Sequence, residues 1–447
     1  MRIADLKNEL YELDVMDMHE FQRMRDYRFE KLVRHHYENN PAYRSLLNEN
    51  GISEGNLPER VSEIGRLPIT EREWFEKVRI HENPSVRYII KKIETTGSTG
   101  MPFLFPYSKK VAEKLAGELF ARSILMAGIE PEETTYSVTH WFPGGKDVWA
   151  SHEAMLQYAR LGGKCIDEST QTPLQQHIKN MIENGVKYSV SGPPFYNALA
   201  SVVKGEGLED RIKLEVVAAG GGGVLDEDHL FVKDALSLRS YRLFYVVTEG
   251  GGIGVQVEEK GPYCLFSDGH VIEVVDKHLN PVKEGETGRI LITPFDMDSV
   301  PVIRYVLGDE VRYLGERPFE GYSKFVPVID NIRRFKDALI GGGLLPLSQI
   351  EEMPKYMRKG GVIALGVQIA KRTKGRKDWP IIRLEVPPGQ DPGMLKKSAI
   401  KVFRKNIQMD FLIKSKEIEP PAVEVYGPGE LRGKRLKPTL FVDETGR

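Results

Sequence analysis

The 447-residue sequence predicts an α/β fold: a large N-terminal domain with mostly parallel sheets flanked by helices plus a β-rich subdomain, and a small α+β C-terminal domain. Strand and helix patterns alternate up to about residue 247, which is typical of a parallel sheet covered on both faces. Short alternating strands follow from about residue 255, and the composition shifts at residues 331–337. We therefore expect one domain of residues 1–335 and another of residues 336–447.

The composition narrows the range of partners. The chain has 63 Lys and Arg against 64 Asp and Glu, so a net charge of −1 gives no general attraction to nucleic acid or an anionic membrane. No apolar run reaches the roughly 20 residues that span a bilayer, and the N-terminus lacks a secretory signal. Cys165 and Cys264 are too few for a disulfide framework or a four-thiolate zinc site. We expect a cytoplasmic protein that binds neither nucleic acid nor membrane.

Helical periodicity defines the first elements. Residues 17–40 carry one apolar stripe that includes Phe21, Phe29 and Val33. The Ser108 side chain can cap a long helix that ends near Gly128. Beyond that helix the patterns predict helices near residues 151–161, 174–184, 194–203 and 226–236, and strands near residues 187–190, 212–219 and 241–247.

The segment before the Ser108 helix is rich in hydroxyl groups. Thr95, Thr96, Gly97, Ser98, Thr99 and Gly100 place four hydroxyl side chains and two glycines in six positions. Glycine lets backbone N–H groups approach an anion, and Ser and Thr add neutral donors, so the composition favours a phosphate-binding loop. A polar β-hairpin turn is the alternative reading of the same residues. The loop is not a Walker loop, because Met101 and Pro102 stand where that pattern has Lys and Ser or Thr.

Two predicted strands end in glycine runs. The first is followed by Gly220 to Gly223 and the second by Thr248, Glu249 and Gly250 to Gly252. Ligands of open α/β sheets lie outside the carboxyl ends of the strands, so glycine there leaves room for a flat ring or a phosphate. Either run alone is equally consistent with a tight turn. The two runs together favour a ligand site.

The order of these motifs resembles the adenylate-forming superfamily, and within it the phenylacetate-CoA ligase branch. The resemblance runs nearly end to end, through residues 40–44, 67–70, 95–102, 142–145, 245–249, 300–309 and 334–351. It implies ATP-dependent activation of a carboxylic acid to an acyl-adenylate with release of pyrophosphate, and transfer of the acyl group to coenzyme A. Such an enzyme needs ATP, Mg²⁺, a carboxylic acid and an acyl acceptor.

The resemblance also implies roles for individual residues. Residues Thr95 to Gly100 would hold the β- and γ-phosphates, Thr248 would contact the α-phosphate, and Glu249 would bind Mg²⁺. Asp309 would accept hydrogen bonds from the ribose hydroxyls, with Arg334 at the same end of the nucleotide. The remaining nucleotide-binding candidates are Gly220, Gly221, Gly222 and Tyr245. Taken alone, a Thr-Glu pair is usually a helix start and Gly-Asp a turn.

The C-terminal domain carries the expected adenylation lysine. Lys437 precedes Asp443 by six residues, the spacing that this branch shows, and Lys434 is its competitor. A lysine here would pair with the substrate carboxylate and the α-phosphate in the transition state. The resemblance implies that this small domain is mobile and rotates between the two half-reactions, with Asp337 as the hinge residue. A surface lysine in a basic tail is the alternative reading.

The acyl pocket is less well defined. His140, Trp141, Phe142 and Gly144 lie at the element that resembles the family's Phe-Thr-Gly-Gly, and their aromatic surface suits an aryl or similar carboxylate. Core packing explains any one of them equally well. The sequence departs from the family in lacking a lysine beside Pro102 and in carrying Gly220 to Gly223 in place of Gly-Ala-Glu-Pro. Cys264 with His270 gives two ligands and does not make a zinc site, so zinc is not expected.

Two rival readings stay open. The acyl group can pass to an amine or to a protein thiol, as in amide or acyl-protein synthetases. Alternatively, the chain is a nucleotide-binding protein that has lost catalysis, which the missing loop lysine and the altered glycine element would explain. A homodimer is compatible with either reading.

Overall fold

The computed structural model describes residues 2–94, 103–139, 148–221, 224, 226–319, 322–334, 337–340, 343–375, 377–414, 416, 418–431 and 439–445. Within these ranges no helix is long and apolar enough to cross a membrane. The fold is mixed α/β, and the predicted fold class is confirmed.

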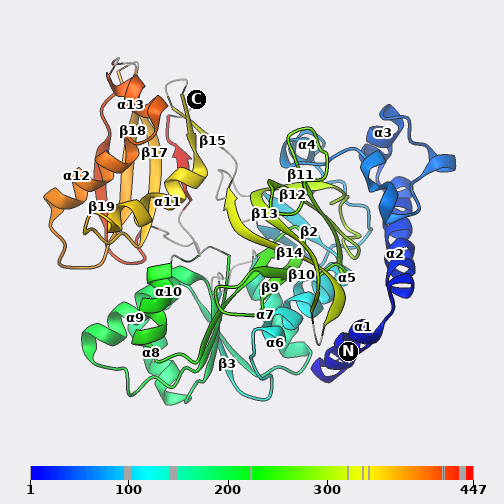
Figure 1. The fold of residues 1–447 in the computed structure, drawn as a ribbon, viewed down its shortest axis with the longest axis horizontal. Helices are drawn as coiled ribbons and strands as arrows, with labels where there is room; N and C mark the ends of the chain where they lie inside the picture. The colour runs from blue at the N-terminus through cyan, green and yellow to red at the C-terminus, as the bar shows by residue number, and fades with distance from the viewer. Residues whose placement is uncertain are drawn as a thin grey trace.

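The chain begins with a helical region that packs along one side of the molecule (Figure 1). Asp17 caps the long second helix by accepting a hydrogen bond from the Glu20 N–H, and Asn40 caps the third through the Tyr43 N–H. The elements of this region are α1 (Ile3–Val15), α2 (Met18–Asn39), α3 (Pro41–Glu49), η1 (Glu54–Asn56), η2 (Val61–Arg66) and α4 (Arg72–Lys77).

A small sheet and a long composite helix follow. The sheet joins β1 (Lys91–Glu94), β2 (Leu104–Tyr107) and β4 (Val148–Trp149) in the order β2-β1-β4. The Ser108 side chain accepts a hydrogen bond from the Val111 N–H, as predicted for a helix cap. The helix runs as α5 (Lys109–Val111), a π-helical segment η3 (Ala112–Glu118) and α6 (Leu119–Met126). Its middle part is therefore wider than the regular helix that periodicity predicts.

The largest sheet has 11 described strands in the order β11-β12-β13-β14-β10-β9-β8-β7-β6-β3-β5. The strands from β5 to β8 are parallel neighbours, and those from β8 to β11 are antiparallel neighbours. The predicted β-rich part thus continues the parallel sheet, because β10 pairs with both β9 and β14. The strands are β3 (Thr135–Thr139), β5 (Cys165–Ser169), β6 (Tyr188–Ser191), β7 (Val216–Gly220), β8 (Ser240–Val247), β9 (Gly251–Gln256), β10 (Tyr263–Leu265), β11 (His270–Val275), β12 (Thr287–Pro294), β13 (Tyr305–Phe319) and β14 (Ser323–Arg334).

Four helices connect the parallel strands, and their positions agree with the predicted ones to within a few residues. They are α7 (Ala150–Arg160), α8 (Leu174–Glu183), α9 (Pro193–Glu206) and α10 (Asp226–Ala235). One large hydrophobic cluster holds the helices and the sheet together, with members from Ile3 to Ile329. A second cluster fixes α2 and α3 to the strands near Phe295.

The last part of the chain has its own sheet, ordered β19-β18-β17-β20, and its own hydrophobic cluster, whose members run from Ala338 to Ile418. Figure 1 shows these elements together at the upper left of the molecule. They are β15 (Asp337–Ile340), β16 (Gly343–Pro346), α11 (Leu347–Arg358), β17 (Gly366–Lys374), β18 (Lys377–Glu385), α12 (Pro392–Phe403), α13 (Ile407–Lys414), β19 (Ala422–Tyr426) and β20 (Phe441–Asp443).

Candidate active site

The candidate site lies where the parallel strands end. Because β3, β5, β6, β7 and β8 run in the same direction, their carboxyl ends share one edge of the sheet. Residues 140–147 follow β3, Gly221 follows β7, and Thr248 with Glu249 follows β8. Among the described residues, the topology therefore brings Gly221 and the Thr248–Glu249 pair to one edge, whereas residues 140–147 lie outside the described part of the chain.

Thr248 and Glu249 occupy the turn between β8 and β9, and both are half-buried. The Tyr107 hydroxyl donates a hydrogen bond of 2.6 Å to the Thr248 carbonyl oxygen. Burial first, and then the negative charge of Glu249, raise the pKa of Tyr107 and of Tyr305 above the ordinary value. Both phenols therefore stay protonated at neutral pH beside the Glu249 carboxylate.

Asp309 and Tyr245 form a second part of the site. The Tyr245 hydroxyl donates a hydrogen bond of 2.7 Å to Asp309 Oδ2, and both side chains are buried. Asp309 lies on β13 directly opposite Arg334 on β14. Tyr245 and Asp309 are 64 positions apart along the chain but are hydrogen-bonded in the fold. Arg334 is the partner of Asp309 on the next strand, so three predicted nucleotide-binding positions are neighbours.

Close contacts and positive φ angles explain why glycine occupies several positions of the two runs. A side chain at Gly220 would meet the Phe244 ring at 2.2 Å, and Gly221 has a φ of +82°. Gly251 has a φ of +68°, and a Cβ there would lie 2.1 Å from the Leu115 carbonyl oxygen. A Cβ at Gly252 would lie 2.7 Å from the Leu119 carbonyl oxygen. The run after β8 therefore allows the composite helix to approach β9 closely.

Several predicted site residues lie outside the described part of the chain: Thr95, Thr96, Gly97, Ser98, Thr99, Gly100, Gly222, His140, Trp141, Phe142, Gly144 and Lys437. Hydrogen bonds hold the chain on both sides of residues 432–438. The Gly429 N–H donates to Glu385 Oε1 at 2.8 Å, and Gln368 Nε2 donates to the Thr439 carbonyl at 2.8 Å. Asp337 is the first residue of β15, opposite Pro346.

His270 and Cys264 are both buried in the sheet. The His270 ring nitrogens lie 2.9 Å from the Gly250 carbonyl oxygen and 3.2 Å from that of Phe266. Among the described residues, no group of three or more His, Cys, Asp and Glu side chains is placed to hold a metal. His270 instead supports the backbone next to Glu249.

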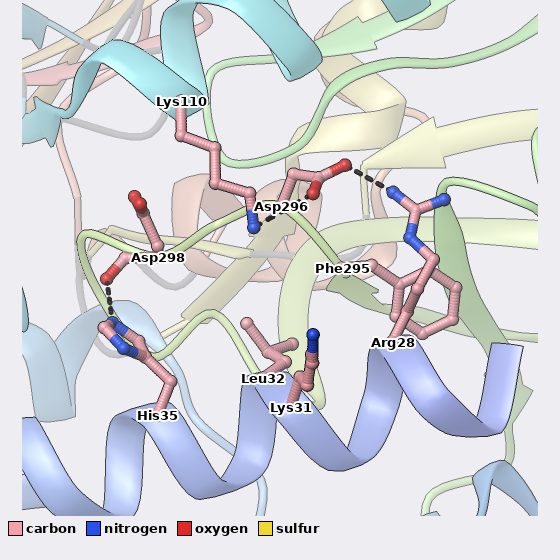
Figure 2. A pocket seen from close by; sticks show the side chains of 8 residues that line it. All are labelled: Arg28, Lys31, Leu32, His35, Lys110, Phe295, Asp296 and Asp298. Atoms are coloured by element: carbon pink, nitrogen blue, oxygen red, sulfur yellow. Dashed lines mark hydrogen bonds and ion pairs between the residues drawn. The ribbon is translucent and has the colours of Figure 1, made fainter. Parts of the chain in front are cut away.

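A cavity of about 330 Å³ lies between α2, the start of α5 and the connection from β12 to β13 (Figure 2). Asp296 forms one ion pair with Arg28 and another, at 3.1 Å, with Lys110. His35 Nε2 lies 2.8 Å from the Asp298 carbonyl oxygen. The charges that line this cavity largely pair with each other, and they fasten α2 to the sheet.

Sequence reasoning missed Tyr107 and the part played by Thr70. The Thr70 carbonyl accepts from the Val306 N–H at 3.0 Å, and its hydroxyl donates to the Ile303 carbonyl at 2.9 Å. Arg304 also holds this segment, by donating to the Leu67 carbonyl at 2.8 Å. Two segments recognised separately in the sequence, residues 67–70 and 300–309, are thus bonded to each other. Nothing in the sequence indicated that these two segments pair with each other.

No family model matches the chain, but several known proteins are similar to it in sequence or in fold. The chain is 26% identical over 313 residues to a phenylacetate-coenzyme A ligase of Thermus thermophilus, covering 67% of each protein. It is 24% identical over 360 residues to the Escherichia coli enzyme of the same name, covering 77% of this chain and 78% of that one. A 2-hydroxyisobutyryl-CoA ligase in the postadenylation state matches the fold with a TM-score of 0.70, at 16% identity, over 97% of this chain and 92% of that structure.

The sequence matches support an adenylate-forming ligase, and the fold agrees with that class. The match to the solved structure supports the fold, and the sequence matches support the phenylacetate-CoA ligases as a similar class of enzyme. These sequence matches are all to phenylacetate-CoA ligases, and they support the resemblance to that branch of the adenylate-forming superfamily.

Proposed function

We propose that this protein activates a carboxylic acid with ATP and transfers the acyl group to coenzyme A. The carboxylate oxygen attacks the α-phosphorus, and the bond to pyrophosphate breaks. The coenzyme A sulfur then attacks the acyl carbon, and AMP and the thiol proton leave. The observation that best supports the proposal is the buried Tyr245–Asp309 pair, close in the fold to the strand end that carries Thr248 and Glu249. Ligands of such sheets bind at that edge.

The nucleotide end of the site rests on Asp309. A buried carboxylate held by a tyrosine hydroxyl keeps acceptor capacity for the ribose hydroxyls, and Arg334 stands opposite on the next strand. Residues Thr95 to Gly100 would hold the phosphates, and Thr248 would contact the α-phosphate. Gly220 to Gly222 would border the base, where the absence of side chains widens the pocket.

Glu249 fits a magnesium site. Mg²⁺ is held in many nucleotide enzymes by one or two carboxylates together with phosphate oxygens and water. Glu249 offers one carboxylate on a turn held between β8 and β9, and two protonated phenols border it. The ion would neutralise charge on the phosphates, while the protein side chains orient them.

The division into domains and the role of Lys437 complete the proposal. Residues 1–335 would bind ATP and the acid, and residues 336–447, which have a hydrophobic cluster of their own, would carry Lys437. Asp337 would act as the hinge between them. His140, Trp141, Phe142 and Gly144 would line the pocket for an aryl or similar carboxylate.

A pyrophosphate exchange screen over a panel of carboxylic acids tests the proposal. We expect carboxylate-dependent exchange, and a coenzyme A thioester when coenzyme A is added. Lys437→Ala should lower the adenylation rate roughly a hundredfold, the usual effect of losing one such contact, and leave ATP affinity nearly unchanged. Lys434→Ala is the matched control and should retain the rate. Glu249→Gln should weaken the dependence on Mg²⁺.

Other outcomes favour the rival readings. Exchange without a thioester would point to an amine or a protein thiol as the acceptor, and would keep the adenylation step. ATP binding without exchange for any acid would point to a nucleotide-binding protein that has lost catalysis. A full rate in Lys437→Ala with a loss in Lys434→Ala would transfer the catalytic role to Lys434.

A further inference from the structure

The hairpin turn between β8 and β9 is short and carries Glu249. The Gly250 N–H donates a hydrogen bond of 3.3 Å to the Val247 carbonyl oxygen, which closes a four-residue β-turn with Glu249 at its third position. Val247 and Gly251 are paired with each other at the ends of the two strands. The turn is therefore closed by a hydrogen bond of its own directly beside Glu249.

Two buried rings hold the carbonyl groups of the residues on either side of Glu249. The Tyr107 hydroxyl donates a hydrogen bond of 2.6 Å to the Thr248 carbonyl oxygen, and His270 Nε2 lies 2.9 Å from the Gly250 carbonyl oxygen. A neutral imidazole has one N–H, and the shorter of the two His270 contacts assigns it to Nε2. Both rings are fully buried, so water does not compete for these carbonyl groups.

These contacts fix the backbone at Glu249. A peptide unit is planar, so the direction of the Glu249 side chain depends on the orientation of the peptides before and after its Cα. Tyr107 holds the peptide before it through the Thr248 carbonyl, and the turn bond holds the peptide after it through the Gly250 N–H. His270 holds the next peptide along. With both neighbouring peptides held, the Cβ of Glu249 points in one direction.

The Tyr107 bond also joins two sheets at this turn. Tyr107 lies on β2 of the three-stranded sheet, whereas Thr248 follows β8 of the large sheet. A Cβ at Gly250 would lie 2.8 Å from the Ile292 side chain and 3.4 Å from His270 Nε2. The turn therefore packs closely against β11 and β12, and Tyr107 links it to the small sheet.

We propose that Tyr107 is a positioning residue for the Glu249 carboxylate, and thereby for the Mg²⁺ ion that accompanies ATP. This inference rests on the proposed function, in which Glu249 binds the metal. Loss of a contact that orients a metal ligand usually costs about ten- to a hundredfold in metal affinity. A purely structural role would instead lower stability and leave the metal dependence unchanged.

The test measures binding and does not depend on activity. Calorimetric titration of the full chain with ATP, once at saturating Mg²⁺ and once in EDTA, gives the preference of the protein for Mg²⁺-bound over metal-free ATP. Tyr107→Phe keeps the ring and removes the hydroxyl. We expect the preference to fall about tenfold, towards that of Glu249→Gln, because the carboxylate is no longer held in place. The Kd for metal-free ATP should stay within about threefold, because no charged contact is lost.

Tyr196→Phe is the matched control. The Tyr196 ring is as deeply buried as that of Tyr107, and its hydroxyl donates a hydrogen bond of 3.0 Å to the Ser189 hydroxyl on β6, away from the turn. This variant should keep the wild-type preference for Mg²⁺-bound ATP. An equal loss of preference in Tyr196→Phe would show a general loosening of the fold and would overturn the positioning role.

The remaining outcomes separate this inference from the proposed function. A wild-type preference in Tyr107→Phe, when Glu249→Gln has lost it, would overturn the inference alone. Loss of the preference in Tyr107→Phe, with no pyrophosphate exchange for any acid in the wild type, would support the positioning role and count against the proposed function. A wild-type protein without any preference for Mg²⁺-bound ATP would overturn the inference together with the metal role of Glu249.

Discussion

The glycine runs after β7 and β8 look alike in the sequence but differ in what surrounds them. Gly220 faces the ring of Phe244, a buried side chain that packs edge-to-face against Phe120. Gly251 and Gly252 face backbone carbonyls of the composite helix, which cannot change rotamer as a side chain can. A side chain at Gly220, beside the proposed nucleotide pocket, would therefore clash with another side chain, whereas one at Gly251 or Gly252 would clash with backbone. The same residue type thus avoids a clash with a side chain in one place and with a helix backbone in the other.

The largest effect should come from Gly251→Ala. The new Cβ would collide with the Leu115 carbonyl, and the backbone has a positive φ of +68° that alanine adopts poorly. We expect a loss of about 3–5 kcal/mol in the free energy of unfolding, as for severe overpacking. Urea unfolding followed by circular dichroism measures it. A loss below about 1 kcal/mol would mean that the helix moves away at little cost.

Gly220→Ala should have a smaller effect. The added methyl group meets the Phe244 ring, so we expect a loss of about 1–3 kcal/mol. The double variant with Phe244→Leu should recover part of this loss, and a double-mutant cycle isolates the coupling between the two sites. Additive effects would show that the ring is not what requires glycine here. ATP affinity of the same variants tells whether the run borders the nucleotide.

The run after β8 should also make stability depend on pH through His270. Burial lowers the pKa of His270 below its ordinary 6.5, although the carbonyls of Gly250 and Phe266 partly oppose this. The folded protein therefore favours the neutral ring, while the unfolded chain takes up a proton as the pH falls through 6.5. Stability from this group is complete above that pH and is lost below it, by at most about 1.4 kcal/mol per pH unit. His270→Gln should show a shallower decline between pH 6.5 and 5 in urea unfolding.

The smallest effect should come from Gly205→Ala, a control for both runs. Gly205 lies within α9, and no atom stands within 4 Å of the Cβ that alanine would add. Alanine is the better helix former, so we expect a gain of about 0.5–1 kcal/mol. Differential scanning calorimetry would record a slightly higher Tm. A loss in this variant would imply that glycine matters for reasons other than the close contacts described above.

Much of the fold could be predicted from local pattern. The cap at Ser108 and the helices α7 to α10 follow from periodicity and from capping chemistry, which depend on neighbours in the sequence. The π-helical segment could not be predicted, because it packs against β9, where the carbonyl groups of Leu115 and Leu119 face Gly251 and Gly252. The continuity of the sheet was also missed, since the pairing of β10 with β14 joins residues far apart in the chain.

The site was predicted from the order of motifs rather than from their contacts. That order placed Thr248, Glu249 and Asp309 together in the proposed site, but it gave no reason to expect Tyr107, whose hydroxyl contacts Thr248 across 141 positions. Tyr107 stands in a plain apolar strand and carries no pattern of its own. Contacts of this kind depend on which strands become neighbours, and only the fold determines that.

The late position of β14 in the chain has a consequence for synthesis on the ribosome. Until Ser323–Arg334 emerges, β10 has no partner on one side, and the strands β11 to β13 are not joined to β8 to β10. About 70 residues separate β10 from the end of β14, so at 5–20 residues per second the nascent chain exposes an unpaired strand edge for roughly 4–14 s. Such edges invite pairing with other chains. A chain truncated before residue 323 should therefore depend on chaperones. A chain that also contains β14 should complete the pairing of β10 and join β13 to the sheet.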